Sequence, residues 1–303
     1  MYLCPDCRKE FHADQNICSW CGWKKEEYDG VQVFLSTKDA NDPQFASYRG
    51  IYDTLADKNS KKPSEGNVYI EHLAKRFVAN LGDVADKDVC DVGSGRGFFI
   101  KHVLNRKPRS VTAVDIAGLS LKHIVDTYSV AAVQANAENL PFQNQFDVIS
   151  ATDILEHVLN VSNFMLTANW ALRQGGTLAI RVPYKESLIY YSKFFGLPFP
   201  YAHLRSFNKE LLVDTVHQYG FKVSAVHYDG FRSAILQDVW NKVPSVGRRL
   251  TARIQKHFPD EDEVAGINPF IGRLLMKPIE ITVIARKVMD VPVKNVYENY
   301  LNY

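Results

Sequence analysis

The residues best suited to metal chemistry are four cysteines near the start of the chain. They form two Cys-x-x-Cys pairs separated by ten residues, Cys4 with Cys7 and Cys18 with Cys21. Four thiolates at this spacing suit one tetrahedral zinc ion, and a complete sulfur shell leaves no open position, so we expect a structural zinc. Disulfides are the alternative, disfavoured because the chain begins without a secretory signal pattern. The spacing does not say whether such a zinc ribbon binds nucleic acid, binds protein or only folds.

A glycine-rich turn between an apolar run and a helical pattern is the second chemical signal. Residues 88–92 are typical of a strand, and Gly93, Gly95 and Gly97 follow at alternate positions. Glycines let the backbone approach a ligand closely, and the start of a helix offers free amides to an anionic group. About twenty residues on, the next apolar run ends in Asp115, a position suited to the hydroxyls of a ribose. We therefore expect a nucleotide-containing cofactor. The alternate glycines do not fit the pyridine-nucleotide pattern, which disfavours a dehydrogenase.

These residues need a scaffold, and the remaining pattern predicts a doubly wound α/β sheet. Apolar runs typical of strands alternate with helical periodicity, which places helices on both faces of a mainly parallel sheet. The expected strands are residues 88–92, 110–115, 131–134, 146–151, 176–182, 221–227 and 279–285. The expected helices lie near residues 97–105, 119–126, 160–173 and 208–219, with one more ending before Gly82.

The predicted organisation is a small metal domain followed by one large catalytic domain. We assign residues 1–25 to the zinc ribbon, 26–45 to a linker, 46–287 to the α/β domain and 288–303 to a C-terminal tail. Insertions are expected at 183–207, which is rich in aromatic residues, and at 230–278. Cys90, the fifth cysteine, lies in an apolar run and is expected in the core.

Six segments occur in an order that resembles one enzyme family. They are residues 91–97, Asp115, and residues 136–142, 146–150, 153–158 and 172–178. Together they resemble the motifs of class I S-adenosylmethionine-dependent methyltransferases, over about residues 45–287. The resemblance implies a Rossmann-like seven-stranded sheet, with S-adenosylmethionine at the carboxyl ends of the strands.

The resemblance also implies roles for individual residues. Gly93 and its neighbours would pass under the methionine part of the cofactor, and Asp115 would bind the ribose. An acceptor at Asn136, or at Ala137 and Glu138, would face the adenine amino group. The family usually has Asp at position 136, but the Asn carbonyl oxygen can also accept a hydrogen bond. The expected cofactor residues are Asp91, Gly93, Ser94, Gly95, Gly97, Asp115, Ile116, Asn136, Ala137, Glu138 and Thr152.

Methyl transfer needs mainly alignment, because a sulfonium is already an activated methyl donor. A hydroxyl acceptor must also lose a proton, for which a base titrating near neutral pH is suitable. We expect Asp153 and His157 to border the acceptor, with His203 as a second base. A purely structural role is the alternative for each histidine.

The acceptor is less constrained than the cofactor. No Asn/Asp-Pro-Pro-Tyr/Phe motif follows the fourth strand, and no cysteine lies near the fourth or fifth, which disfavours adenine N-methylation and covalent cytosine methylation. We expect a hydroxyl of a sugar, a glycan precursor or another small metabolite. The alternatives are a ribosomal or transfer RNA methyltransferase that uses the ribbon to contact RNA, and a non-catalytic binding module.

Charge and hydropathy bear on partners and location. The net charge is +2, and the first 30 residues hold four Lys/Arg and six Asp/Glu, which disfavours nucleic acid as a partner. Residues 239–258 form a basic amphipathic pattern that could contact a membrane or a lipid-linked substrate, or be only a solvated face. No apolar run is long enough to span a membrane, and we expect a cytoplasmic protein. The sequence predicts no oligomeric state.

Overall fold

The computed structural model describes residues 2–12, 14–61, 66–186, 188, 203–230, 232–233 and 276–292. Most of the two predicted insertions, the basic pattern at 239–258 and most of the C-terminal tail lie outside these residues. Within the described part, no helix is long and apolar enough to cross a bilayer.

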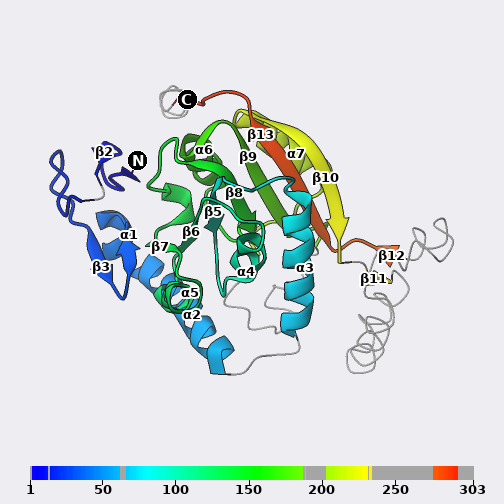
Figure 1. Cartoon of the computed structure of the whole chain (residues 1–303), viewed down its shortest axis with the longest axis horizontal. Helices are drawn as coiled ribbons and strands as arrows, with labels where there is room; N and C mark the ends of the chain where they lie inside the picture. Colours follow the sequence, from blue (N-terminus) through cyan, green and yellow to red (C-terminus); the bar gives the residue numbers. More distant parts are fainter. Residues whose placement is uncertain are drawn as a thin grey trace.

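A nine-stranded sheet forms the centre of the molecule (Figure 1). Its strand order is β10-β13-β9-β8-β5-β6-β7-β4-β3. Strands β4 to β9 run parallel where they pair, whereas β13 is antiparallel to both β9 and β10, and β3 is antiparallel to β4. The strands are β3 (Glu26–Tyr28), β4 (Val31–Val33), β5 (Asp88–Val92), β6 (Ser110–Asp115), β7 (Ala131–Gln134), β8 (Phe146–Thr152), β9 (Leu172–Pro183), β10 (Phe221–Asp229) and β13 (Glu280–Lys287).

Helices cover both faces of this sheet, which confirms the predicted Rossmann-like α/β class. They are α1 (Thr37–Asn41), α2 (Pro43–Lys61), α3 (Gly66–Asn80), α4 (Phe98–Leu104), α5 (Gly118–Tyr128), η1 (Ala137–Asn139), α6 (Val161–Ala171) and α7 (Lys209–Gln218). Each predicted strand and helix of the α/β domain is present, and its ends differ from the prediction by a few residues.

Successive side chains of a buried strand point to opposite faces of the sheet, so the apolar strand residues form two cores, one on each face. On one face, side chains of α3, α4 and α5 pack against alternate strand residues such as Val89 and Val148. On the other face, α6 and α7 pack against their neighbours Cys90 and Ile149. Cys90 is fully buried, in agreement with the predicted core role. This second core extends into the N-terminal segment, because it includes Phe11, Trp23 and Phe34.

The N-terminal segment is part of the central sheet, which corrects the prediction of a linker at 26–45. Strands β3 and β4 form a hairpin, and Val31 to Val33 pair in parallel with Ala132 to Gln134 of β7. The sheet therefore has nine strands instead of the seven implied by the family resemblance. Strand β3 reads Glu-Glu-Tyr and is exposed, because it is the edge strand, and charged residues are common on edges.

Before the hairpin, β1 (Tyr2–Leu3) and β2 (Glu10–Phe11) form a small separate sheet. The remaining short pair is β11 (Arg232–Ser233) with β12 (Met276–Lys277).

Candidate functional site

A pocket of about 710 Å³ lies at the carboxyl ends of the parallel strands, where β5, β6, β7 and β8 lead into their following loops. Helix α2 lies over it, with Tyr48 and Tyr52 in the wall. The pocket brings together most of the residues predicted from sequence. Those that line it are Asp91, Gly93, Ser94, Gly95, Asp115, Ile116, Asn136, Ala137, Glu138, Thr152, Asp153 and His157. Gly97 and His203 do not line it.

The glycine turn shapes one wall of the pocket. Gly93 has a φ of +73°, and a Cβ at this position would lie 1.9 Å from Cδ1 of Ile154. Gly97 has a φ of +77°, and its Cβ would lie 2.7 Å from the Tyr128 ring. Both positions therefore need glycine for the backbone and for packing. Gly97 lets the start of α4 pack against α5 and does not line the pocket.

Asp115, at the end of β6, is oriented by the glycine turn. Its carboxylate accepts hydrogen bonds from the amides of Gly95 and Ala117, both at 2.8 Å. Burial raises its pKa, although these amide hydrogen bonds act in the opposite direction. Each carboxylate oxygen can accept more than one hydrogen bond, so the group can hold the turn and still bind ligand hydroxyls.

Two polar side chains at the base of the pocket differ in how they are satisfied. Asp91 is 2% exposed and accepts a hydrogen bond from Ser150 at 2.6 Å; burial raises its pKa to about 7. Ser94 is also buried, but its hydroxyl has no hydrogen-bond partner within the described residues. A buried, unpaired hydroxyl is costly, so it fits a ligand with a polar group at this point.

The expected adenine end of the pocket is built around η1. The Asn136 side chain caps this helix by accepting from the Glu138 amide at 3.0 Å, and it donates to Asp39. Glu138 in turn accepts a hydrogen bond from the amide of Leu159 at 2.8 Å, which joins η1 to the loop after β8. One lone pair of the Asn136 oxygen is thus used for capping, and the other is available to a ligand.

The opposite end of the pocket carries an ion pair between a buried arginine and an exposed carboxylate. Asp153 follows β8 with a φ of +58°, and its carboxylate accepts from Arg181 at 2.7 Å. Arg181 is 3% exposed and its guanidinium lies 5.9 Å from the centre of the Phe77 ring. The sequence prediction missed Arg181, although an arginine inside the apolar strand at 176–182 was a detectable signal, since buried charges are rare unless paired.

His157 and His203 lie together at this end. Their rings form an edge-to-face pair with centroids 4.6 Å apart. The Tyr52 ring, on α2, also lies edge-to-face with His157, and the centroids of these two rings are 6.4 Å apart. Burial lowers the pKa of His157 to about 4, and the neighbouring His203 adds to this effect. His157 is therefore neutral near pH 7. His203 lies behind it, with Nδ1 hydrogen-bonded to Glu186.

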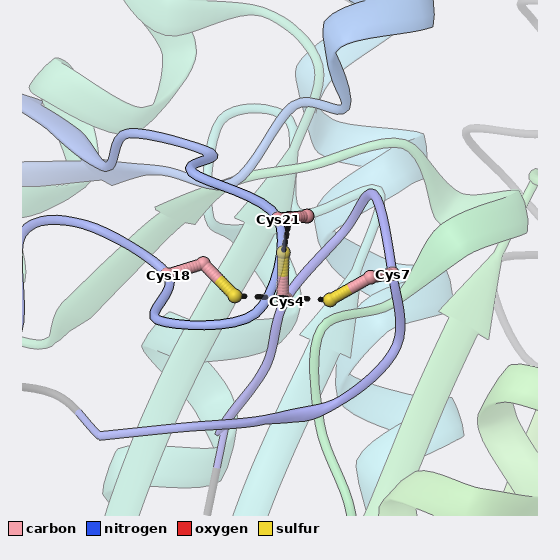
Figure 2. Close-up of side chains that lie close together, drawn as sticks. All are labelled: Cys4, Cys7, Cys18 and Cys21. Atoms are coloured by element: carbon pink, nitrogen blue, oxygen red, sulfur yellow. Dashed lines mark hydrogen bonds between the residues drawn. The ribbon is translucent and has the colours of Figure 1, made fainter.

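The four predicted metal-binding cysteines also converge (Figure 2). The Sγ atoms of Cys4 and Cys21 are 3.5 Å apart, those of Cys7 and Cys18 are 3.7 Å apart, and all four lie within 4.8 Å of one another. A tetrahedral zinc with bonds of about 2.3 Å requires sulfur separations of about 3.8 Å, so the donor set fits zinc.

This cysteine cluster is attached to the end of the pocket that is built around η1. Nη1 of Arg8 donates to Asn139 Oδ1 at 2.7 Å and to the Leu140 carbonyl at 3.0 Å. Asn139 returns a hydrogen bond to the Pro5 carbonyl, and Leu3 donates to the carbonyl of Pro141. Residues 3–8, around the first two cysteines, therefore support the loop that carries η1, a contact that no local sequence signal indicated.

The comparisons with known proteins agree with this geometry. A family model described as a methyltransferase domain matches residues 67–226, slightly more than half of the chain. The chain belongs to this family of methyltransferase domains.

Individual relatives are more distant. The chain is 28% identical over 123 residues to the ubiquinone biosynthesis O-methyltransferase of Rickettsia prowazekii, a match that covers 38% of this chain and 47% of that protein. It is 25% identical over 111 residues to the tRNA U34 carboxymethyltransferase of Colwellia psychrerythraea, covering 35% and 34%. The chain thus matches about half the length of the first relative and a third of the second.

A solved structure shares the fold. The Burkholderia thailandensis 1,6-didemethyltoxoflavin-N1-methyltransferase, solved with 1,6-didemethyltoxoflavin and S-adenosylhomocysteine, aligns with a TM-score of 0.52 at 16% identity. The alignment covers 81% of this chain and 90% of that one.

Proposed function

We propose that this protein transfers a methyl group from S-adenosylmethionine to a hydroxyl of a small molecule. The observation that carries the proposal is one continuous pocket that runs from the glycine turn and Asp115 to Arg181 and His157. The first end offers backbone amides, a buried hydroxyl and an oriented carboxylate for the cofactor. The second end offers titratable groups for an acceptor.

The cofactor is proposed to lie with its ribose on Asp115 and its amino-acid part along Gly93 to Gly95. The unpaired hydroxyl of Ser94 supports this placement, because a ligand carboxylate or amino group would satisfy it. Adenine would then lie between Ile116 and the Asn136–Glu138 loop, all in the pocket wall. S-adenosylmethionine supplies the methyl group, and the protein supplies alignment of the acceptor with the sulfur–methyl bond.

The acceptor hydroxyl is proposed to lie beside His157, which lines the pocket and is packed against His203. Arg181 would position Asp153 at the same border through their ion pair. A small-molecule hydroxyl is supported by similarity to a ubiquinone biosynthesis O-methyltransferase. RNA is the competing acceptor, since a tRNA carboxymethyltransferase is also similar, but the surplus of acidic residues in the first 30 disfavours phosphate contacts.

The four cysteines are proposed to bind one structural zinc ion. The sulfur separations suit a tetrahedral shell, and four thiolates leave no position for a substrate. Zinc would fasten the segment that supports the η1 loop, so its proposed role is to stabilise the cofactor end of the pocket rather than to take part in methyl transfer.

Incubation with S-adenosylmethionine labelled in the methyl group and fractionated cell extract tests the function. We expect label in a small molecule, in an ether linkage that survives mild base. Label in RNA would replace the small-molecule acceptor, and failure of the protein to bind S-adenosylhomocysteine in calorimetry would contradict the proposal altogether. The variant Asp115→Ala tests the placement of the cofactor, because it removes the carboxylate proposed to bind the ribose. It should weaken S-adenosylhomocysteine binding at least about tenfold, since hydrogen bonds to a charged group contribute about 1.5 to 3 kcal/mol.

A further inference from the structure

A carboxylate and two imidazoles meet beside the acceptor end of the pocket. Ligand atoms of Glu156, His157 and His203 all lie within 4.8 Å of one another. The first two follow β8, whereas His203 comes from the segment before α7. The amide of Leu204 donates to the Glu156 carbonyl at 2.8 Å, which holds the two segments in register.

Glu156 is the least satisfied member of this group. It is 1% exposed, and neither of its carboxylate oxygens has a hydrogen-bond partner within the described residues. An unpaired carboxylate buried to this degree is strongly unfavourable in its charged form. Such groups are generally paired with a cation or coordinate a metal, and Glu156 is directed at the two histidines.

His203 is arranged as a metal-binding histidine usually is. Its Nδ1 is hydrogen-bonded to Glu186, so Nε2 is the ring nitrogen that would act as the ligand. Metal-ligating histidines commonly donate their other N–H to a carboxylate, because this fixes the tautomer and the ring orientation. Glu186 would be that outer partner.

The charges around the group favour a cation. Asp153, Glu186 and Glu280 are the acidic neighbours that act on Glu156. Arg181 is paired with Asp153, and Arg205 donates to the carbonyls of the loop that contains Glu156, so neither is bonded to the Glu156 carboxylate.

We propose that Glu156, His157 and His203 bind a divalent transition-metal cation at the acceptor end of the pocket. Two imidazole nitrogens and one carboxylate oxygen suit Mn²⁺, Fe²⁺, Co²⁺ or Zn²⁺ better than Ca²⁺ or Mg²⁺, which prefer all-oxygen shells. Three protein ligands leave coordination positions open, unlike the closed shell of the four cysteines. This would be a second metal site, of a different chemical class from the first.

The role of this cation rests on the proposed methyl transfer. A bound cation lowers the pKa of a coordinated hydroxyl, so the acceptor releases its proton to water and keeps the electron pair on oxygen. That pair forms the new oxygen–methyl bond while the sulfur–methyl bond breaks, and its electrons return to sulfur as a neutral thioether. His157, the member of the group that lines the pocket, places the cation next to the acceptor. The histidines then act as ligands instead of as a general base.

Manganese binding to the full-length protein tests the site. Protein is treated with a chelator until one zinc per chain remains, and Mn²⁺ alone is then added and followed by electron paramagnetic resonance. Mn²⁺ competes poorly for thiolates, so the four cysteines keep their zinc. We expect one bound Mn²⁺ per chain, whose electron spin-echo signal is modulated by the nitrogen nuclei of the imidazole ligands. Glu156→Gln should weaken the affinity about 100-fold and Glu186→Gln about tenfold, as is typical of outer partners.

An exposed carboxylate outside the pocket, Asp126 on α5, provides the control. Asp126→Asn should leave Mn²⁺ affinity unchanged. S-adenosylhomocysteine binding by each variant verifies that the fold is intact, and Glu186→Gln keeps the test decisive if Glu156→Gln does not fold. Absence of Mn²⁺ binding by the wild-type protein, or equal binding by Glu156→Gln and wild type, would overturn the proposal. Methyl transfer at full rate by metal-depleted protein would overturn the catalytic role alone. Mn²⁺ binding without any methyl transfer would instead count against the proposed function.

Discussion

Gly93 shows how one residue in the cofactor turn meets two separate requirements. Its positive φ disfavours any side chain, and the Ile154 side chain occupies the place where a Cβ would be. Ile154 belongs to the loop that leads from β8 to Glu156 and His157. The absence of a side chain at Gly93 therefore lets this loop pack directly against the turn.

Substitution of this glycine separates the two requirements. Gly93→Ala should destabilise the protein by roughly 2 to 4 kcal/mol, because the backbone penalty of about 1 kcal/mol is joined by a clash in a packed site. Gly82→Ala is the matched control, since Gly82 has a φ of +75° but no atom within 4 Å of the place that a Cβ would occupy. It should lose only the backbone contribution. Denaturant unfolding measures both, and equal losses would show that the contact with Ile154 is unimportant.

The sequence predicts the site residues that belong to a motif. It does not predict those whose role depends on which side chains pack around them in the folded protein. Gly93 and Asp115 follow from their spacing after apolar runs, and the structure places both in the pocket. The buried carboxylate of Glu156 could not be foreseen, because its isolation depends on how the segment before α7 folds back onto the β8 loop. Arg181 left a local signal, but its partner Asp153 is 28 positions away in the sequence.

At the scale of elements, periodicity predicted the α/β domain and failed at its edge. The buried strands β5 to β8 are apolar runs, so their positions could be read directly. Strands β3 and β4 are three residues each. Strand β3 is exposed, β4 buries only Val31 fully, and the pair joins the sheet through the pairing of β4 with β7. Short edge strands of this kind have no pattern that distinguishes them from a linker.

The predicted linker is in fact the means by which the cysteine cluster reaches the cofactor pocket. The β4–β7 pairing places the N-terminal segment next to the loop that follows β7, and Arg8 contacts Asn139 and Leu140 there. The geometry of the cysteine cluster and the affinity for the cofactor should therefore be linked.

Loss of this contact should weaken cofactor binding without removing any cofactor contact. Arg8→Ala deletes the donor to Asn139, and we expect S-adenosylhomocysteine affinity to fall roughly three- to tenfold, in line with about 1 kcal/mol for a partly exposed hydrogen bond to a loop. Lys9→Ala is the matched control, because Lys9 is a neighbouring cation that lies over the Trp20 ring instead. Titration calorimetry compares the two variants. An unchanged affinity in Arg8→Ala would mean that the N-terminal segment does not support the η1 loop.

Across the whole molecule, the two ends of the sheet have different tasks. The carboxyl ends of the strands hold the pocket, whereas the amino end of β5 holds an ionic cluster. Asp88 accepts hydrogen bonds from Arg109 and Arg173, and its own amide donates to Asp147. These residues come from β5, β8, β9 and the segment before β6, so the cluster ties four strands together at the end remote from the pocket.

This separation predicts a pH-dependent loss of stability that leaves ligand binding unaffected. Hydrogen bonds from Arg109, with Ser110 and Arg173 adding, hold the pKa of Asp88 well below its ordinary value. A lowered pKa in the folded state means that the stabilisation is complete above the unfolded pKa of about 3.9 and is lost as pH falls below it. Asp88→Asn should therefore cost about 1 to 2 kcal/mol at pH 7, a modest figure because Arg109 is 57% exposed and screened by water.

The difference between Asp88→Asn and wild type should begin to shrink as the pH falls below about 4, because the unfolded wild-type chain then binds a proton at Asp88 that the folded protein does not yet bind. Asp126→Asn is the matched control: it disrupts an exposed pair with Lys122 one helical turn away and should cost less than about 0.5 kcal/mol at every pH. Denaturant unfolding at several pH values measures both variants, and calorimetry with S-adenosylhomocysteine at pH 7 should return the wild-type affinity for each. A cost that does not decrease at all between pH 5 and pH 3 would mean that Asp88 acts through packing rather than charge. A weakened affinity would mean that the amino end of the sheet is coupled to the pocket through β5, whose far end carries Asp91 and the glycine turn.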